Sequence, residues 1–283
     1  MVKEGSRRRE EPEVFPSNWW GQRDQWRFGG RLPVGIQVMI GCLAWVLFIA
    51  FWHYMATVGA KNTALLPSPW EVMTALRELF MERNFATDVG QSLKRIFLSF
   101  GLALLIALPI GLCMGTFPAV ESFANALVSP FRYLPAPSFV PLLLMWLGTG
   151  DSQKIALLIL GVVFFLITLF MDNTRQVSRE LVECARTFGA RGGKLMLKVI
   201  FPAALPHYVT TARQMLAVSW TYLVIAEIVA ATNGIGAMMM RARRVIQVDD
   251  IMAGILVIGL LGMTCDLLLR TLHRKWFRYL YVS

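Results

Sequence analysis

Long apolar runs occupy most of this 283-residue sequence and are separated by short polar segments. A helix needs about 20 mostly apolar residues to cross the roughly 30 Å hydrocarbon layer of a bilayer. The sequence predicts six such helices, at about residues 34–58, 90–116, 120–147, 153–173, 206–232 and 250–271. It lacks the roughly ten-residue alternating segments of a membrane β-barrel. We therefore expect an all-α polytopic membrane protein with about six transmembrane helices.

Positive charge predicts how these spans are oriented. The formal net charge is +10, although only 16% of the residues are charged. In a membrane protein, an excess of Lys and Arg marks cytoplasmic loops rather than a nucleic-acid site. Seven of the 28 Lys and Arg residues precede the first span, six follow the fourth and four lie at the C-terminal end. Both termini are therefore expected in the cytoplasm, although a cluster of three arginines, residues 241, 243 and 244, then lies outside.

The polar N-terminal segment contains no apolar stretch that would serve as a signal peptide. Its second half alternates Trp and Phe with Arg, which suits a segment lying at the cytoplasmic headgroups. A disordered tail is the alternative for residues 1–18. The expected organisation is an N-terminal segment, a first span, an outer loop, a core domain and a cytoplasmic tail, at residues 1–33, 34–58, 59–89, 90–272 and 273–283.

The outer loop carries the signals of a short amphipathic helix. Ser68 and Glu71 have the spacing of a capping box, and Pro69 suits the first helical position. Apolar residues then recur on one helical face from Val72 to Phe80. We expect this helix to pack on the outer surface of the bundle, and a contact for an external partner is the alternative.

Three prolines, Pro135, Pro137 and Pro141, interrupt the third predicted span. They cannot lie in an unbroken helix, and irregular backbone at membrane depth must face protein or a water-filled cavity. The segment is therefore expected to be a kinked or broken span on a translocation path, and a simple packing kink is the alternative. Arg132, just before it, is expected either to face an anion or to extend to the membrane interface.

Charged residues inside predicted spans mark functional sites more often than charges elsewhere. Glu227 is the foremost case here, with a structural bond to a neighbouring helix as the alternative, and Arg213 is the next. We place Glu227 and Trp220 on the candidate translocation path. Asp266 and Arg270 are four residues apart and are expected to pair at a helix end.

The polar stretch ELVECARTFGARGGKLMLKVIFPAALP, residues 180–206, stands between two apolar blocks. Ser178 is a suitable cap for a helix whose residues 181, 182, 185 and 188 form one apolar stripe, and Gly189 suits the left-handed turn that ends such a helix. A second short helix is expected from about Gly193, with Pro202 stopping it. The result is a helix–Gly–helix elbow at residues 176–202 in the cytoplasm.

The Gly-Gly-Lys within this elbow does not make a phosphate-binding loop. Such a loop requires a glycine five residues before the Gly-Lys pair and Ser or Thr after it, and these positions are Phe188 and Leu195. We expect no nucleotide site, no metal site and no cofactor in this chain.

Glu183, Cys184, Ala185, Gly189 and Pro202 have the spacing of the EAA loop of ABC importer permeases, E-A-A-x3-G-x9-I-x-L-P, with Cys in place of the middle Ala. The stretches LPSPWEV, SLKRIFLSFGLALLIALPIG, RYLPAPSFVPLLLMWLG and AEIVAATNGIG also resemble the nitrate/taurine/sulfonate/bicarbonate-type members. The resemblance covers roughly residues 60–275. It implies the type I ABC importer permease fold in a bacterial inner membrane, with the five EAA-loop residues forming the elbow that couples to an ATPase.

The same resemblance implies a non-catalytic subunit working as a homodimer in the lipid bilayer. Two cytoplasmic ATPase subunits would bind ATP and Mg²⁺, and an extracytoplasmic binding protein would deliver the solute. The expected solute is a small anion such as a sulfonate, taurine, nitrate or bicarbonate. A neutral or heterocyclic solute, such as a thiamine-precursor pyrimidine, is the alternative.

Two other classes of protein fit the sequence less well. A stand-alone secondary transporter or channel would show inverted repeats between its halves, and it gives the elbow no purpose. An intramembrane enzyme would need a catalytic cluster, but the three histidines, His53, His207 and His273, are far apart in the sequence.

Overall fold

A computed structural model describes residues 33–59, 65–230 and 232–280. The predicted N-terminal segment therefore lies outside the described residues, apart from Pro33, as do the last three residues of the predicted tail. All regular elements among the described residues are helices. The chain divides into two units, Met1–Gly59 and Ala60–Ser283.

The first unit contains helix α1, Val34–Tyr54, which continues into a π-helical turn at Met55–Gly59. Together they form an apolar segment of 26 residues, long enough to cross a membrane. No residue of α1 is buried by the rest of the chain. A helix that is apolar on every side suits a lipid surrounding, so α1 provides the first predicted span.

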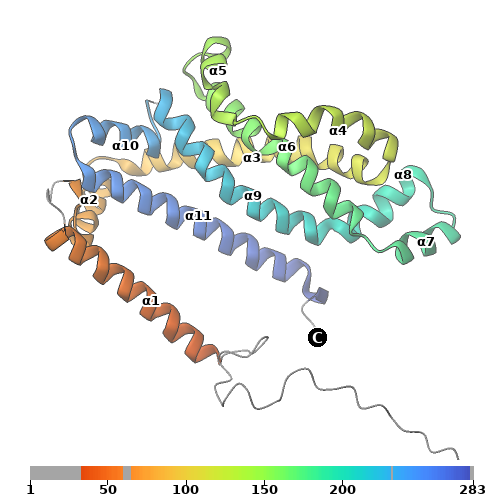
Figure 1. Ribbon diagram of the computed structural model, residues 1–283, viewed down its shortest axis with the longest axis horizontal. Helices are drawn as coiled ribbons and strands as arrows, with labels where there is room; N and C mark the ends of the chain where they lie inside the picture. Colours follow the sequence, from red (N-terminus) through yellow and green to blue (C-terminus); the bar gives the residue numbers. More distant parts are fainter. Residues whose placement is uncertain (1–32, 60–64, 231, 281–283) are drawn as a thin grey trace, which may run out of the picture. The chain divides into compact units, whose positions relative to one another are not determined.

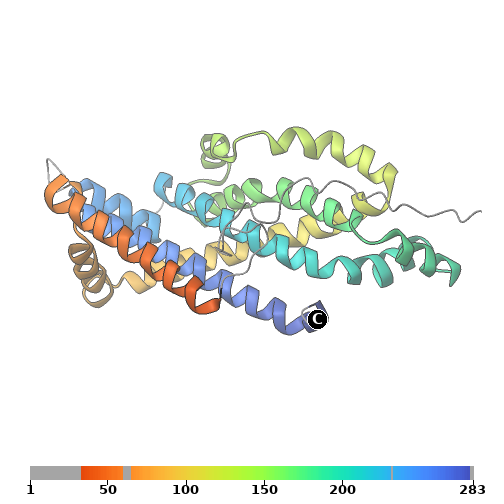
Figure 2. The same ribbon diagram turned by 60° about the horizontal axis from the view of Figure 1, so that its bottom comes forward.

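The second unit is a bundle of long helices with short helices at each end. Its α-helices are α2 (Pro69–Met81), α3 (Phe85–Thr116), α4 (Pro118–Arg132), α5 (Val140–Leu147), α6 (Asp151–Arg175), α7 (Arg179–Thr187), α8 (Gly192–Leu195), α9 (Phe201–Ala230), α10 (Ile235–Arg244) and α11 (Val248–Trp276). Short α2 and α10 gather at one end of the long helices, and α7 and α8 lie at the other (Figures 1 and 2).

Close packing of α3 against α6 forms the centre of the core. Gly111 and Gly115 of α3 are four residues apart, a spacing that lets two membrane helices approach closely. A Cβ atom at Gly111 would lie 2.6 Å from the Cβ of Phe170, and one at Gly115 would overlap the side chain of Thr174. The backbone of α3 therefore contacts side chains of α6 directly, and neither glycine position has room for a larger residue.

The predicted spans and the observed helices agree in four places. Helices long and apolar enough to cross a membrane occupy residues 34–59, 85–116, 151–175 and 248–276. The fifth predicted span is covered by α9, whose 30 residues extend about 45 Å at 1.5 Å per residue. The observed α3 begins at Phe85, earlier than predicted, because its first turns carry polar residues that are buried in the protein.

The third predicted span is broken, as the prolines indicate. Helix α4 ends at Arg132, a 3₁₀ turn follows at Ala136–Phe139, and α5 is only eight residues long. At 1.5 Å per residue, neither helix reaches across about 30 Å of hydrocarbon. Residues 120–147 are therefore not one membrane-spanning helix.

The predicted amphipathic helix is present as α2. The Ser68 hydroxyl accepts a hydrogen bond from the Glu71 N–H, and the Glu71 carboxylate accepts one from the Ser68 N–H at 2.6 Å. Val72, Ala75 and Leu79 are buried. Trp70, by contrast, is 77% exposed. The helix thus packs one face on the bundle, as predicted, and its place on the outer side of the membrane stays a prediction.

Candidate functional site

The first candidate site is the elbow formed by α7, α8 and the turn between them. The Ser178 hydroxyl caps α7 by accepting a hydrogen bond from the Leu181 N–H at 3.3 Å. Gly189 has φ +84°, the left-handed conformation predicted from the sequence. The Gly189 N–H donates to the Arg186 carbonyl at 2.9 Å, and the Ala190 N–H to the Ala185 carbonyl at 3.0 Å. This pair of bonds is the Schellman arrangement, which ends a helix and reverses the chain.

The two faces of α7 have different surroundings. Val182 and Ala185 are partly buried against the hydrophobic core. Glu183 and Cys184 are exposed, and Phe188 is 87% exposed. Phe188 was expected in the same apolar stripe as Val182 and Ala185, and this was wrong because the residue caps the helix end and turns away from the packed face. The exposed Phe188 side chain is available for contact with another protein.

The second half of the elbow does not end at Pro202. Helix α8 runs through a π-helical turn, Met196–Ile200, directly into α9. Pro202 follows directly on this π-helical turn and Pro206 lies inside α9, so the chain continues as a helix despite the backbone N–H groups that these prolines lack. The prediction that Pro202 stops the helix is therefore wrong. We call the continuous helical segment of residues 192–230 the elbow rod.

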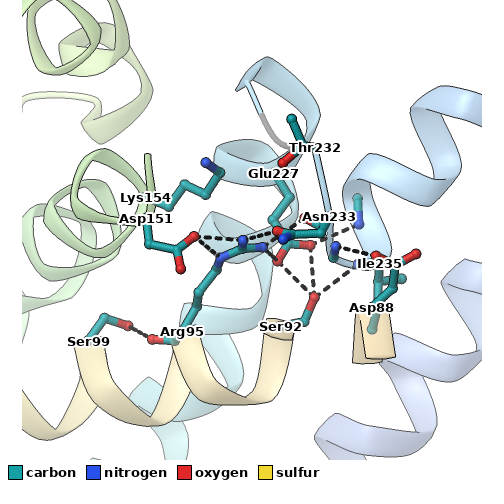
Figure 3. A network of polar contacts seen from close by, with 12 residues as sticks. Asp88, Ser92, Arg95, Ser99, Asp151, Lys154, Glu227, Thr232, Asn233 and Ile235 are labelled. Atoms are coloured by element: carbon teal, nitrogen blue, oxygen red, sulfur yellow. Dashed lines mark hydrogen bonds and ion pairs between the residues drawn. The ribbon is translucent and has the colours of Figure 1, made fainter. Parts of the chain in front are cut away.

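The second candidate site is a buried ionic network near the other end of the elbow rod (Figure 3). We use this name for Asp88, Ser92, Arg95, Asp151, Lys154, Glu227 and residues 232–236. For brevity we call residues 232–236 a loop, although the last two are the first residues of α10. The Glu227 carboxylate accepts hydrogen bonds from Arg95 Nη1 at 2.7 Å, Ser92 Oγ at 2.8 Å and the Gly236 N–H at 2.9 Å. Its side chain has no exposed surface. The carboxylate therefore bonds to neighbouring elements, which is the structural role that the sequence analysis gave as the alternative for Glu227.

Arg95 connects four segments of the chain. Its Nε and Nη2 lie 2.9 and 2.7 Å from the same oxygen of Asp151, Oδ1. Its Nη1 also donates to the Asn233 carbonyl at 2.9 Å, and its Nη2 donates to the Asn233 side-chain oxygen. The Arg95 side chain is 2% exposed, whereas that of Asp151 is 42% exposed. Asp151 is therefore the outermost part of this contact.

The loop of residues 232–236 explains the TNGIG sequence after α9. Its backbone N–H groups point to acceptors on other helices: Gly234 to Asp88 Oδ1 at 2.7 Å, and Ile235 to Ser92 Oγ at 3.0 Å. Gly234 has φ +106°, and a Cβ atom there would lie 2.6 Å from Arg95 Nη1. Only glycine both adopts this positive φ readily and leaves room for the Arg95 guanidinium. The loop thus fits closely over the ion pair of Arg95 and Glu227.

Lys154 supplies a second buried cation. It is 2% exposed, and its Nζ donates to the carbonyls of Thr149 and Gly150 at 2.9 and 3.0 Å. Figure 3 shows the Asp151 carboxylate bonded to the Arg95 guanidinium and the Lys154 side chain on the same helix as Asp151. Nearby, Arg241 pairs with Asp88 at 2.5 Å. Sequence reasoning missed Arg95, Asp151 and Lys154, although each is a charge within or at the edge of a predicted span, which was the signal to follow.

The structure does not bring the other residues of the predicted path to the network. Trp220 is buried, and its Cδ1 lies 3.6 Å from the Cβ position of Gly262 on α11. Arg132 is half-buried, and its Nη2 donates to the hydroxyl of the exposed Tyr133 at 3.3 Å. The three prolines flank or enter the 3₁₀ turn and α5. A path through these residues stays a prediction.

The expected pair of Asp266 with Arg270 was wrong. Asp266 instead lies on the face of α11 toward α9, where its Oδ1 is 3.1 Å from Arg213 Nε. Arg213 thereby has an ion-pair partner, although its buried Nε makes no hydrogen bond.

A family model and individual relatives both identify the family of this chain. Residues 99–278 match the family described as "Binding-protein-dependent transport system inner membrane component". The chain is 30% identical over 254 residues to the taurine transport system permease protein TauC of Escherichia coli strain K12, covering 88% of this chain and 92% of TauC. It is 32% identical over 248 residues to the aliphatic sulfonates transport permease protein SsuC, named as putative, of the same strain, covering 88% and 90%.

Solved structures show the fold. The MetNI methionine ABC transporter in an inward-facing conformation aligns with TM-score 0.56 and 22% identity, over 66% of this chain and 95% of the solved one. An amino acid ABC transporter aligns with TM-score 0.57 and 19% identity, over 71% and 97%. The expected type I ABC importer permease fold is thus confirmed. The chain belongs to the family of inner membrane components of binding-protein-dependent transport systems.

Proposed function

We propose that this chain is the membrane subunit of an ATP-driven importer for a small anion, with sulfonates such as taurine as the leading class. The observation that carries the proposal is the elbow: a capped helix with exposed Glu183 and Phe188, joined to a helix that extends to the far end of the bundle. The sulfonate class rests on the relatives named for taurine and aliphatic sulfonates.

The proposed assembly contains two copies of this chain and two cytoplasmic ATPase subunits, which bind ATP and Mg²⁺. An extracytoplasmic binding protein delivers the solute to the opposite face. The elbow carries Arg186, Arg191, Lys194 and Lys198, which supports a cytoplasmic elbow by the positive-inside rule. With the elbow inside, α2, α10 and the ionic network belong to the outward half, and both termini are cytoplasmic.

The proposed mechanism uses the elbow rod to link the ATPase to the outward half of the bundle. Helix α9 alone extends about 45 Å, and its packing against α6 holds it along the bundle. When the ATPases close on ATP, they shift the two elbows, and each rod moves as a stiff body. The two arrangements of the bundle differ in their affinity for closed and open ATPases, and this difference couples ATP hydrolysis to transport.

The test is uptake of a radiolabelled sulfonate into proteoliposomes that contain this chain, its ATPase and its binding protein. Uptake should require all three components and ATP. Uptake by this chain alone would refute the proposal in favour of a channel or secondary transporter. A thermal-shift screen of the binding protein against sulfonates, nitrate, bicarbonate and neutral heterocycles identifies the solute, and a neutral ligand would refute the anion class.

A further inference from the structure

Asp88 is already neutralised by Arg241, and the remaining charges of the ionic network balance only because Asp151 is present. Arg95 and Lys154 are both buried cations, and Glu227 is a buried anion that neutralises one of them. Asp151 supplies the second negative charge and lies at the rim, with its side chain 42% exposed. Removing the Asp151 carboxylate would leave one uncompensated buried positive charge, and such a charge strongly favours an anion.

The way in which Asp151 binds Arg95 leaves room for a better partner. One oxygen, Oδ1, accepts from both Nε and Nη2 of Arg95. Arginine presents these two donors as a fork that suits two acceptor oxygens. The nearby Lys154 ammonium donates only to two backbone carbonyls, which carry no full charge. An oxyanion with three oxygens could accept from both donors of Arg95 and from Lys154.

The position of Asp151 allows it to leave. It is the first residue of α6, and its helix begins after the sequence Gly148-Thr149-Gly150. Gly148 has φ +70°, and the Cβ positions of Gly148 and Gly150 have no atom within 4 Å. The start of α6 therefore borders open space. The outermost residue of the contact thus follows two glycines that no neighbouring atom crowds.

We propose that Arg95 and Lys154 form an anion-binding station for a monovalent oxyanion of the sulfonate class, and that the Asp151 carboxylate occupies the station when the solute is absent. The solute displaces Asp151, accepts hydrogen bonds from Arg95 and Lys154, and restores the charge balance. The exchange also frees the first turn of α6 from α3, so solute arrival loosens the contact between these helices. This proposal rests on the proposed function, because it names residues that receive the imported anion.

The test measures anion binding to the complex of the full-length chain with its ATPase in nanodiscs, without the binding protein. The probe is ³⁵S-labelled methanesulfonate, and dimethyl sulfone, its uncharged analogue, is the competitor that controls for shape. Asp151→Ala should raise methanesulfonate affinity about tenfold or more, the size expected from freeing a hydrogen bond to a charged group. Dimethyl sulfone should not compete in either protein.

A matched control and a second variant separate the station from a general charge effect. Asp249→Ala removes a carboxylate from the first turn of α11, and it should leave methanesulfonate affinity within twofold of wild type. Adding Lys154→Met to Asp151→Ala should reverse most of the gained affinity. Thermal unfolding of each complex verifies that the variants are folded, and Asp151→Asn, which keeps the side-chain shape, replaces Asp151→Ala if that variant unfolds.

The outcomes distinguish this proposal from the function on which it rests. If wild type imports a sulfonate but both Asp151 variants bind methanesulfonate no better than wild type, the station is refuted and the proposed function stands. An equal gain from Asp249→Ala, or competition by dimethyl sulfone, would also refute the station. If wild type with its partners imports no sulfonate and neither Asp151 variant binds methanesulfonate, both proposals fail together.

Discussion

Replacing Phe188 by Ala tests whether the elbow is a docking surface. Phe188 is 87% exposed in the isolated chain, so its truncation should change the free energy of unfolding by less than about 0.5 kcal/mol. If the side chain is buried in a groove on the ATPase, its loss removes the free energy of burying a phenylalanine. That term is about 2–3 kcal/mol for one side chain, or a loss of roughly 30- to 150-fold in affinity per elbow.

The assay is titration of the purified ATPase onto the chain immobilised in nanodiscs, read by interferometry. Two elbows in a homodimer would contribute about twice the single-site term, roughly 4–6 kcal/mol. Trp70→Ala is the matched control, because Trp70 is 77% exposed on α2 at the opposite end of the bundle. This control should bind the ATPase as wild type does.

Three results would decide the matter. A loss of ATPase affinity for Phe188→Ala at an unchanged melting temperature supports docking by the elbow. Unchanged affinity would refute the reasoning, and so would an equal loss for Trp70→Ala. A large fall in melting temperature for Phe188→Ala would show that the side chain stabilises the permease itself, which its exposure argues against.

Three further substitutions test the fold and the coupling. Gly189→Val should abolish solute-stimulated ATPase activity while the spans stay folded, because a β-branched residue resists φ +84°. Gly193→Ala is the control. Normal stimulation in Gly189→Val would contradict the assignment of residues 176–202 as the coupling elbow. Glu227→Gln should lower the free energy of unfolding by about 3–5 kcal/mol, because it breaks a buried ion pair. The control Glu78→Gln, in an exposed pair, should change this free energy by about 0.5 kcal/mol or less. Chemical unfolding in detergent compares the two variants, and equal effects would contradict the prediction. Gly111→Leu should destabilise by about 1–3 kcal/mol through overpacking against α6, and Gly101→Leu on the same helix, with open space at its Cβ position, should be nearly neutral in the same assay.

The sequence predicted the local features of the chain well. The capping box at Ser68, the cap at Ser178 and the left-handed Gly189 depend on residues within a few positions of each other, so their patterns can be read directly. The break in the third span also follows from prolines alone. These features needed no knowledge of distant contacts.

The long-range contacts could not be predicted in the same way. Arg95 lies within the predicted second span, but its partners Asp151, Glu227 and Asn233 come from segments far away in the sequence. Asp266 had a plausible local partner in Arg270, and only the packing of α9 on α11 brings Arg213 to it. Pro202 was misread because a π-helical turn, which no pattern predicted, precedes it.

The continuity of the elbow rod restricts how this protein can change its length over evolution. Each residue of an α-helix turns the chain by about 100° and advances it by about 1.5 Å. One residue inserted between Pro202 and Glu227 would therefore rotate the carboxylate away from Arg95, or rotate the elbow by the same angle in the other direction. Exposed side chains along this stretch, such as that of Val218, can vary, but the number of residues that separate the elbow from Glu227 is fixed by the helix itself.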